Sequence, residues 1–258
     1  MGVFNSISNQ MVASTILKLL ECEKTEQMSP SIEEVTSCGK RDRVLMYNPD
    51  AIASWIYEKY RDYFKPLFEN NPIELKMYSS IPPVTPVCFA SMYSGLAPSV
   101  HGIQSYVKPI LKCQTIFDLL PQKGKKVAIV STEGDSISTI FLNRNIDYFI
   151  YKTKGECNKK ALELMASDKH DLIVLYNGDY DKAMHYFSPE GKPSLKALKE
   201  NIATYSSLCD KAKEVWTDKK YAIAFAPDHG CHRWFKFLGN HGDDIVQDMN
   251  IMHFWTLN

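Results

Sequence analysis

The sequence has no excess of charge of one sign, no long apolar run and no closely spaced pair of cysteines. Thirty Lys and Arg residues balance thirty Asp and Glu residues, so net charge predicts no affinity for a nucleic-acid polymer. No apolar stretch approaches the roughly 20 residues of a membrane helix, and no basic segment followed by an apolar one opens the chain. We therefore expect a cytoplasmic protein without a membrane partner.

The composition is otherwise that of a globular protein. Of the 258 residues, 45% are hydrophobic and 23% are charged, which excludes collagen-like and low-complexity chains. The seven cysteines are odd in number and widely spread, so we expect neither a disulfide framework nor a cysteine zinc site. The length suits one large domain or two small ones, and no feature sets an oligomeric state.

Short apolar runs alternate with longer amphipathic segments from Arg43 onward. Nearly continuous apolar strands separated by helices predict a mainly parallel sheet with helices on both faces, an α/β/α domain. The predicted strands are Val44–Asn48, Glu74–Tyr78, Lys126–Ser131, Asp147–Tyr151, Asp171–Tyr176, Tyr221–Ala226 and Asn250–Leu257. The predicted helices are Ala51–Phe68, Pro86–Ser94, Thr115–Leu120, Asn158–Ser167 and Ser194–Trp216.

Residues 1–40 precede this alternating pattern. Apolar residues between Gln10 and Cys22 predict a helix, and a polar segment with Pro30 and Gly39 follows it. We expect residues 1–40 to be an N-terminal helical preface and residues 41–258 to be a single α/β/α domain.

Polar residues that follow predicted strands are candidates for a site, because ligands of open α/β sheets bind beyond the carboxyl ends of the strands. Asp50 follows the first strand, just before a helix, where the ordinary role of an aspartate is to cap that helix. Thr85 follows the second strand and precedes Pro86, which is also the pattern of a helix start. The same position favours a hydroxyl nucleophile, because a helix N-terminus stabilises negative charge.

Carboxylate and imidazole side chains follow two further strands. Asp181 and His185 lie four residues apart, so they face the same way on a helical turn and can bind one metal ion. Asp228 and His229 come directly after another strand, and His241 follows twelve residues later. Zinc prefers imidazole nitrogen and carboxylate oxygen, so this clustering favours a metal site over a set of solvated histidines.

These residues, in this order, resemble the alkaline phosphatase superfamily, and more narrowly its nucleotide pyrophosphatase/phosphodiesterase and phosphonoacetate hydrolase branches. The resemblance runs from about Val44 to His253 and is most specific in the nucleophile segment. The residues that match in that segment are Thr85, Ser91, Gly95, Pro98, His101, Gly102 and Ile103.

The resemblance implies an alkaline-phosphatase-like fold that binds two divalent metal ions. The ions are usually zinc in that family, and manganese suits the same ligand types. Asp181, His185 and His241 would hold one ion, and Asp50, Asp228 and His229 the other, with Thr85 at or between them.

The resemblance also implies the reaction. Thr85 would attack a phosphorus atom, become transiently phosphorylated and be released by water. The expected activity is that of a phosphodiesterase or nucleotide pyrophosphatase, and the expected partner is a small phosphate ester or a nucleotide. The alternatives are phosphonate or phosphomonoester hydrolysis on the same fold, and a noncatalytic binding protein that has kept the fold.

Two departures from the family pattern affect the substrate. Cys88 stands three residues after Thr85, where many of the family's diesterases have asparagine, and a thiol is a weak donor. Only residues 230–240 separate the Asp-His motif from the last histidine, so no large cap domain is expected there. Arg233 and Trp234 of this loop would either bind a nucleoside or aryl group or pin the loop to the core. Cys88, Arg233 and Trp234 are thus candidate substrate-binding residues.

Overall fold

An eight-stranded sheet forms the centre of the protein. The computed structural model describes residues 3–235 and 237–258, and its strands lie in the order β1-β3-β10-β7-β2-β6-β4-β5. Every pairing is parallel except the two made by β10. The strands are β1 (Ile7–Ser8), β2 (Arg43–Pro49), β3 (Ile73–Tyr78), β4 (Val127–Thr132), β5 (Asp147–Tyr151), β6 (Leu172–Asn177), β7 (Tyr221–Phe225) and β10 (Asn250–Leu257).

Both faces of this sheet are buried, which explains why its strands are nearly continuous apolar runs. In β2, Val44 and Met46 belong to one hydrophobic core, while Leu45 and Tyr47 belong to the other. Successive side chains of a strand point to opposite faces, so a strand that is covered on both sides needs apolar residues throughout.

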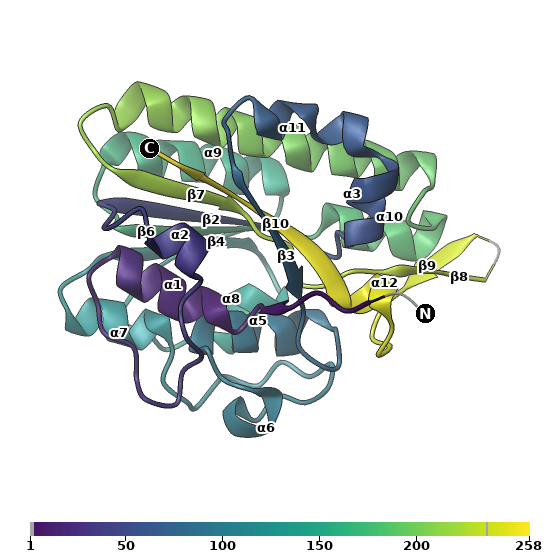
Figure 1. Ribbon diagram of the computed structural model, residues 1–258, viewed down its shortest axis with the longest axis horizontal. Coiled ribbons are helices and arrows are strands. Elements are labelled where there is room, and N and C mark those ends of the chain that lie inside the picture. The colour runs from purple at the N-terminus through teal and green to yellow at the C-terminus, as the bar shows by residue number, and fades with distance from the viewer. Residues whose placement is uncertain (1–2, 236) are drawn as a thin grey trace.

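Helices form a layer on each face of the sheet (Figure 1). These two layers confirm the predicted α/β/α fold. One layer contains α1 (Met11–Leu19), α2 (Glu33–Thr36), α5 (Thr85–Ser94), α7 (Ile116–Gln122) and α8 (Ser136–Ile140). The other contains α3 (Ser54–Lys59), η1 (Arg61–Phe64), α4 (Lys65–Phe68), α9 (Lys154–Ser167), α10 (Asp179–Phe187) and α11 (Lys192–Val215). Two single-turn helices, α6 (Pro98–His101) and α12 (Val246–Met249), lie in loops.

The connection between the Asp-His motif and the last histidine is a short hairpin, as expected for a form without a large cap domain. Its strands are β8 (His232–Trp234) and β9 (Leu238–Asn240), which pair antiparallel. The hairpin projects from one end of the molecule (Figure 1). The sequence did not predict it, because its strands have only three residues each.

The prediction of a single helix over Ala51–Phe68 is wrong. The structure divides this stretch into α3, η1 and α4, and α3 ends at Lys59. Pro66 has no amide hydrogen for a helix interior, and it stands in the first turn of α4 instead. The proline therefore marks a restart of the helix.

Two further findings concern the cysteines and the helices. All seven cysteines are free thiols, and five of them are buried. Among the described residues, no helix combines the length with the apolar character that crossing a bilayer requires.

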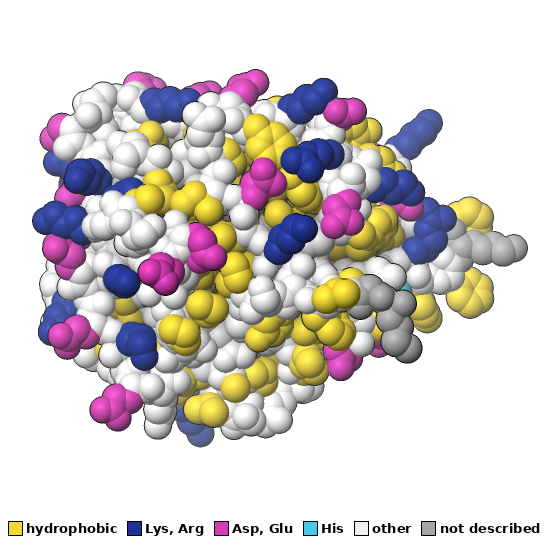
Figure 2. Space-filling model, viewed as in Figure 1, with side chains coloured by type: hydrophobic (Ala, Val, Ile, Leu, Met, Phe, Trp, Pro, Cys, Tyr) yellow, Lys and Arg dark blue, Asp and Glu magenta, His cyan; other side chains and the backbone are white. Residues whose placement is uncertain are grey.

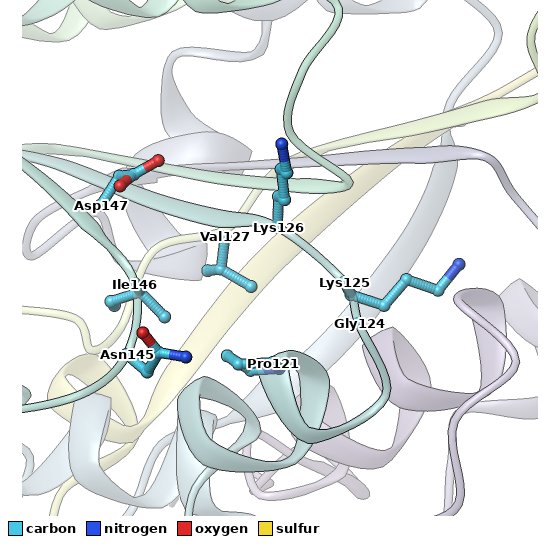
Figure 3. A pocket seen from close by; sticks show the side chains of 8 residues that line it. All are labelled: Pro121, Gly124, Lys125, Lys126, Val127, Asn145, Ile146 and Asp147. Carbon is cyan, nitrogen blue, oxygen red and sulfur yellow. The ribbon is translucent and has the colours of Figure 1, made fainter.

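Charged side chains of both signs are interspersed over the face of the molecule shown in Figure 2. A surface cavity of about 420 Å³ lies at the amino ends of β4 and β5, where Lys126 and Asp147 are among its lining residues (Figure 3). The predicted site residues follow the carboxyl ends of strands, so this cavity lies at the opposite edge of the sheet.

The N-terminal segment packs against the same core as the rest of the chain. Val12, Ile16 and Leu17 of α1 are fully buried in the core that also contains residues of α5. β1 extends the sheet beside β3, with Ile7 opposite Met77. The predicted N-terminal helix is thus present, while the domain boundary at residue 40 stays a prediction.

The substitution Ile16→Ala tests how much this segment contributes to stability. It should lower the free energy of unfolding by about 2–5 kcal/mol, the usual cost of truncating a buried isoleucine. Val3→Ala is the control because Val3 is 85% exposed, and it should change that energy by less than about 0.5 kcal/mol. Urea unfolding followed by circular dichroism measures both. Equal, small effects would mean that α1 contributes little to the core.

Candidate metal centre

The predicted metal-binding residues meet at the carboxyl edge of the centre of the sheet. β7, β2 and β6 are adjacent and parallel, so the segments that follow them lie side by side. Asp50 follows β2, Asp181 lies on α10 after β6, and Asp228 and His229 follow β7. His241 follows β9, at the base of the hairpin.

The first cluster consists of Asp181, His185 and His241. Asp181 Oδ1 lies 3.3 Å from His185 Nε2 and 3.3 Å from His241 Nε2. Asp181 and His185 are one turn apart on α10, as their spacing predicted. The His185 side chain is 36% exposed, so this cluster opens to solvent.

The second cluster consists of Asp50, Asp228 and His229 and is enclosed by protein. Asp50 Oδ1 lies 3.3 Å from His229 Nε2, and Asp228 Oδ2 lies 3.5 Å from the same nitrogen. All three side chains are buried. The ring centroids of His229 and His241 are 4.1 Å apart, so the two clusters adjoin.

Backbone carbonyls orient all three imidazole rings. Each Nδ1 lies 2.8–3.1 Å from a carbonyl oxygen, and a carbonyl only accepts, so Nδ1 donates the hydrogen. In a neutral ring Nε2 then has the free lone pair, which is how proteins present histidine to a metal ion. The accepting carbonyls are those of Gly239 for His185, Gly230 for His229 and Pro83 for His241.

Three buried carboxylate oxygens of these clusters have no hydrogen-bond donor: Asp50 Oδ1, Asp181 Oδ1 and Asp228 Oδ2. They are the same atoms that face the Nε2 nitrogens at 3.3–3.5 Å. Where the rings are neutral, as at His229, acceptor oxygens thus face an acceptor nitrogen inside the protein, an arrangement that is costly by itself. One cation in each cluster would satisfy all of these lone pairs. The donor set therefore fits two divalent metal ions.

The carboxylates of the second cluster resist ionisation in the metal-free protein. Burial and the charge of Asp181 raise the pKa of Asp50 to about 7. Burial and the neighbouring Asp50 raise the pKa of Asp228 as well. Burial lowers the pKa of His229 to about 3, so this ring is neutral. A bound cation would reverse the preference of the carboxyls, because metal ligands bind in their deprotonated form.

The first cluster is instead held by ion pairs when no cation is bound. Burial raises the pKa of Asp181, but His185 and His241 outweigh it, and the net pKa lies below the usual range. The contact with Asp181 raises the pKa of His185. At His241, burial lowers the pKa, and Asp181 more than compensates for it.

Thr85 lies at the second cluster. Its Oγ1 is 3.4 Å from Asp50 Oδ2 and 3.3 Å from His229 Nε2, and the residue is 4% exposed. Pro86 occupies the next position of α5, where its missing amide is tolerated. The start of the helix therefore places a hydroxyl beside a carboxylate and an imidazole.

Neither Asp50 nor Thr85 caps a helix, so the capping roles suggested by their positions are wrong. The N-cap of α3 is Ala53 and that of α5 is Val84. The chain after Asp50 turns sharply instead. Ala51 has a φ of 63°, a backbone conformation that residues other than glycine rarely adopt. The turn directs the Ala51 amide to Asp228 Oδ1 at 3.3 Å.

A buried histidine supports the nucleophile segment. His101 Nδ1 accepts from the Ile103 amide at 3.2 Å, so Nε2 bears the hydrogen and donates to Ser91 Oγ at 2.9 Å. Burial lowers the pKa of His101 to about 4, which keeps the ring neutral. Gly95 ends α5 with a φ of 71°, and a Cβ there would lie 3.1 Å from Met28. These matched residues hold α5 in place rather than forming part of either cluster.

The candidate substrate-binding residues lie in different surroundings. Cys88 is fully buried in α5, and its thiol donates to a backbone carbonyl at 3.7 Å. Arg233 lies on β8 and pairs with Glu190 at 2.8 Å. Trp234 is 52% exposed. Arg233 and Trp234 thus belong to the hairpin whose second strand leads to His241.

A third carboxylate-imidazole cluster, His232, Asp243 and Asp248, was missed from the sequence. Asp248 accepts from His232 Nδ1 at 2.8 Å and from the Asp243 amide at 3.0 Å. These are ordinary hydrogen-bond lengths, so this cluster is satisfied without an ion. It ties the base of the hairpin to the segment after His241.

Tyr176 was missed as well. It is buried, and its hydroxyl donates to Asp50 Oδ2 at 2.5 Å. Its place at the carboxyl end of a predicted strand was the available signal, but an aromatic residue there suggested only core packing.

The comparisons with known proteins find similarity at the level of structure. No protein-family model and no curated sequence matches the chain. Murine ectonucleotide pyrophosphatase/phosphodiesterase 5, an inactive threonine-to-alanine variant with AMP, is similar with a TM-score of 0.59 and 14% identity, over 76% of this chain and 59% of that one. Phosphonoacetate hydrolase from Sinorhizobium meliloti with phosphonoformate is similar with a TM-score of 0.54 and 14% identity, over 74% of this chain and 57% of that one.

This likeness establishes the class of fold. The chain has an alkaline-phosphatase-like fold, in agreement with the resemblance of its motifs. It spans less than 60% of the length of either of these proteins.

The pKa shifts predict how the stability of the metal-free protein depends on pH. Up to about pH 7 the folded state retains on Asp50 a proton that the unfolded chain has released, because its folded pKa of about 7 lies above the ordinary value of 3.8. His185 and His241 likewise keep their protons above the ordinary histidine pKa of 6.5. Stability should therefore fall as the pH rises, by about 1 kcal/mol per pH unit for each retained proton. Melting temperatures in excess chelator measure this trend.

The control is the same series for Asp181→Asn, which removes the charge that raises the pKa values of Asp50, His185 and His241 and should therefore flatten the decline. Added zinc should raise the melting temperature most at high pH, because deprotonated ligands bind the ion. A melting temperature that rises with pH in chelator would contradict the assigned shifts.

Proposed function

We propose that the chain is a metal-dependent hydrolase of phosphate esters that acts as a phosphodiesterase or nucleotide pyrophosphatase. The observation that carries this proposal is the convergence of six ligand-type side chains into two clusters beside one hydroxyl. The three unpartnered carboxylate oxygens support it, because burying them is favourable only with a cation present.

The proposed cofactors are two divalent ions, with zinc as the first choice and manganese as the second. Asp181, His185 and His241 would hold one ion, and Asp50, Asp228 and His229 the other. Three protein ligands for each ion is the pattern of catalytic rather than structural zinc. Bound ions would lower the pKa of a nearby hydroxyl and draw in the negative charge of a phosphate group.

Thr85 is the nucleophile in this proposal. Its hydroxyl loses its proton to water, and Oγ1 forms a bond to phosphorus while the bond between phosphorus and the leaving oxygen breaks. The leaving group departs with the electron pair and takes up a proton from water. Water then hydrolyses the phosphothreonine and restores the hydroxyl. Asp50 and His229 orient the hydroxyl, and its near-complete burial keeps bulk water from competing for the phosphorus atom.

The proposed substrate is a small phosphate ester or nucleotide. The similar solved structures contain AMP, phosphonoformate or phosphonoacetate, which supports a phosphoryl or phosphonate group here. The exposed cluster lies beside the hairpin, since His185 donates to Gly239 of β9. Trp234, Phe235 and Phe237 are all exposed on that hairpin and offer apolar surface to a nucleoside or aryl leaving group.

The second candidate is a phosphonate or phosphomonoester hydrolase with the same centre. The similarity to phosphonoacetate hydrolase, with TM-scores of 0.54 and 0.55, favours it about as strongly. Bis-p-nitrophenyl phosphate, p-nitrophenyl phosphate and phosphonoacetate, each assayed with added zinc or manganese, distinguish the three activities. A noncatalytic binding protein would show no bound metal and no turnover.

Thr85→Ala should keep about two ions per chain and lose turnover by about 10³-fold or more, because the nucleophile is removed while all six ligands stay. Asp181→Ala is the comparison, since it should lose one ion together with activity. Elemental analysis of purified protein and steady-state kinetics measure both. Full activity of Thr85→Ala would exclude the covalent mechanism.

Trp234→Ala should raise the KM for a diester with an aromatic leaving group by several-fold and leave kcat nearly unchanged, because it removes binding surface remote from phosphorus. Tyr186→Ala is the control. Tyr186 is also an exposed aromatic residue, at 68% against 52% for Trp234, but it lines the groove between α10 and α11. Equal effects of the two substitutions would exclude the hairpin as the binding surface.

A further inference from the structure

Tyr176 connects the helix of the proposed nucleophile to a candidate metal ligand. It lies near the end of β6, opposite Asn48 of β2, and its hydroxyl donates to Asp50 Oδ2 at 2.5 Å. The residue is 6% exposed. Its ring packs edge-on against Phe89 of α5, with centroids 5.7 Å apart. The position of this hydroxyl is therefore set by the place of Tyr176 in β6 and by the packing of its ring against Phe89.

The Tyr176 hydroxyl occupies space that is free only because residue 178 is glycine and has no side chain. A Cβ at this position would lie 2.6 Å from the hydroxyl oxygen, far inside van der Waals contact. The backbone does not require glycine there, because its φ of −94° suits any residue. The close approach of the hydroxyl is the reason that a side chain does not fit.

The hydrogen bond from Tyr176 gives the two oxygens of Asp50 different roles. Oδ2 accepts this bond and lies 3.4 Å from Thr85 Oγ1. Oδ1 has no donor and faces His229 Nε2 at 3.3 Å. Burial and the nearby charge of Asp50 raise the pKa of Tyr176 well above its ordinary value, so the phenol remains a donor at every physiological pH.

We propose that Tyr176 is a positioning residue of the second cluster, whose hydroxyl holds Asp50 so that a divalent ion is bound through Oδ1 alone. This inference rests on the proposed function. The carboxylate could otherwise rotate and offer both oxygens to the ion, which would occupy a coordination position needed by the substrate. Outer-shell hydrogen bonds of this kind typically change metal affinity or activity by about 10–100-fold.

The test is a Co²⁺ titration of the chelator-treated, full-length protein, followed by visible absorption. The wild type should show two binding steps, and Tyr176→Phe should weaken one of them by about 10–100-fold and leave the other unchanged. Phenylalanine keeps the packing against Phe89, so the variant should fold, and its melting temperature is measured alongside.

Tyr93→Phe is a closely matched control. Tyr93 is also buried, and its hydroxyl donates at 2.5 Å to Asn48, which belongs to neither cluster. Loss of this bond should lower stability about as much as Tyr176→Phe does, and it should leave both Co²⁺ affinities within about twofold.

Gly178→Ala provides a second, independent variant. The added Cβ displaces the Tyr176 hydroxyl from Asp50 without removing it, so the same binding step should weaken. In the double variant Gly178→Ala/Tyr176→Phe the closest clash is absent, and the effects of the two substitutions should not add.

The outcomes separate this inference from the function on which it rests. Two Co²⁺ steps in the wild type with unchanged affinity in Tyr176→Phe would overturn the inference alone. Equal weakening by Tyr176→Phe and Tyr93→Phe would also overturn it, since any buried hydroxyl would then suffice. A wild type that binds no Co²⁺ would overturn the proposed function and the inference together.

Discussion

The burial of carboxylate oxygens from three aspartates at one edge of the sheet is the constraint on which the rest of the centre depends. Asp50 and Asp228 are removed from water almost completely, and Asp181 lies close enough to raise the pKa of Asp50. Like charges in a low-dielectric environment repel strongly. The surrounding contacts can orient these groups, but only protonation of the carboxyls or a bound cation relieves the repulsion. A cation bound at these groups would therefore stabilise the folded state, because binding and folding are linked.

The orientation of the imidazole rings is consistent with the same constraint. The Nδ1 hydrogen of each ring is donated to a backbone carbonyl, so that a neutral ring presents the lone pair of Nε2 to the carboxylates. A protein that merely neutralised its buried acids would orient the rings the other way. The third cluster does so, because His232 donates directly to Asp248 at 2.8 Å. The difference between the clusters is what separates a candidate metal centre from a structural hydrogen bond.

The sequence predicted the sheet well, because strands that are buried on both faces leave an unambiguous apolar run. Each of the seven predicted strands is present, and the rule for parallel sheets correctly brought Asp50, Asp181 and Asp228 to one edge. The spacing of Asp181 and His185 also predicted their shared face. The division of six residues into two sets came from the family resemblance, and the structure places each set together within 4.8 Å.

The features that the sequence did not predict depend on contacts between distant residues. The bond from Tyr176 to Asp50 joins residues 126 positions apart, and local pattern gives no sign of it. The suggested capping roles of Asp50 and Thr85 failed for the same reason, since long-range packing rather than local propensity sets those turns. The division of the predicted helix Ala51–Phe68 did have a local signal in the sequence, because Pro66 indicated that a new helix begins there.

The segment before Thr85 has one further consequence. The carbonyl of Pro83 accepts a hydrogen bond from His241 Nδ1 at 3.1 Å. Thr85, whose hydroxyl lies at the second cluster, follows Pro83 by only two residues. The His241 ring of the first cluster and the Thr85 hydroxyl at the second are thus both held by the same short segment of backbone. A displacement of this segment would therefore move the Thr85 hydroxyl directly and the His241 ring through its hydrogen bond, so both clusters would respond to it together.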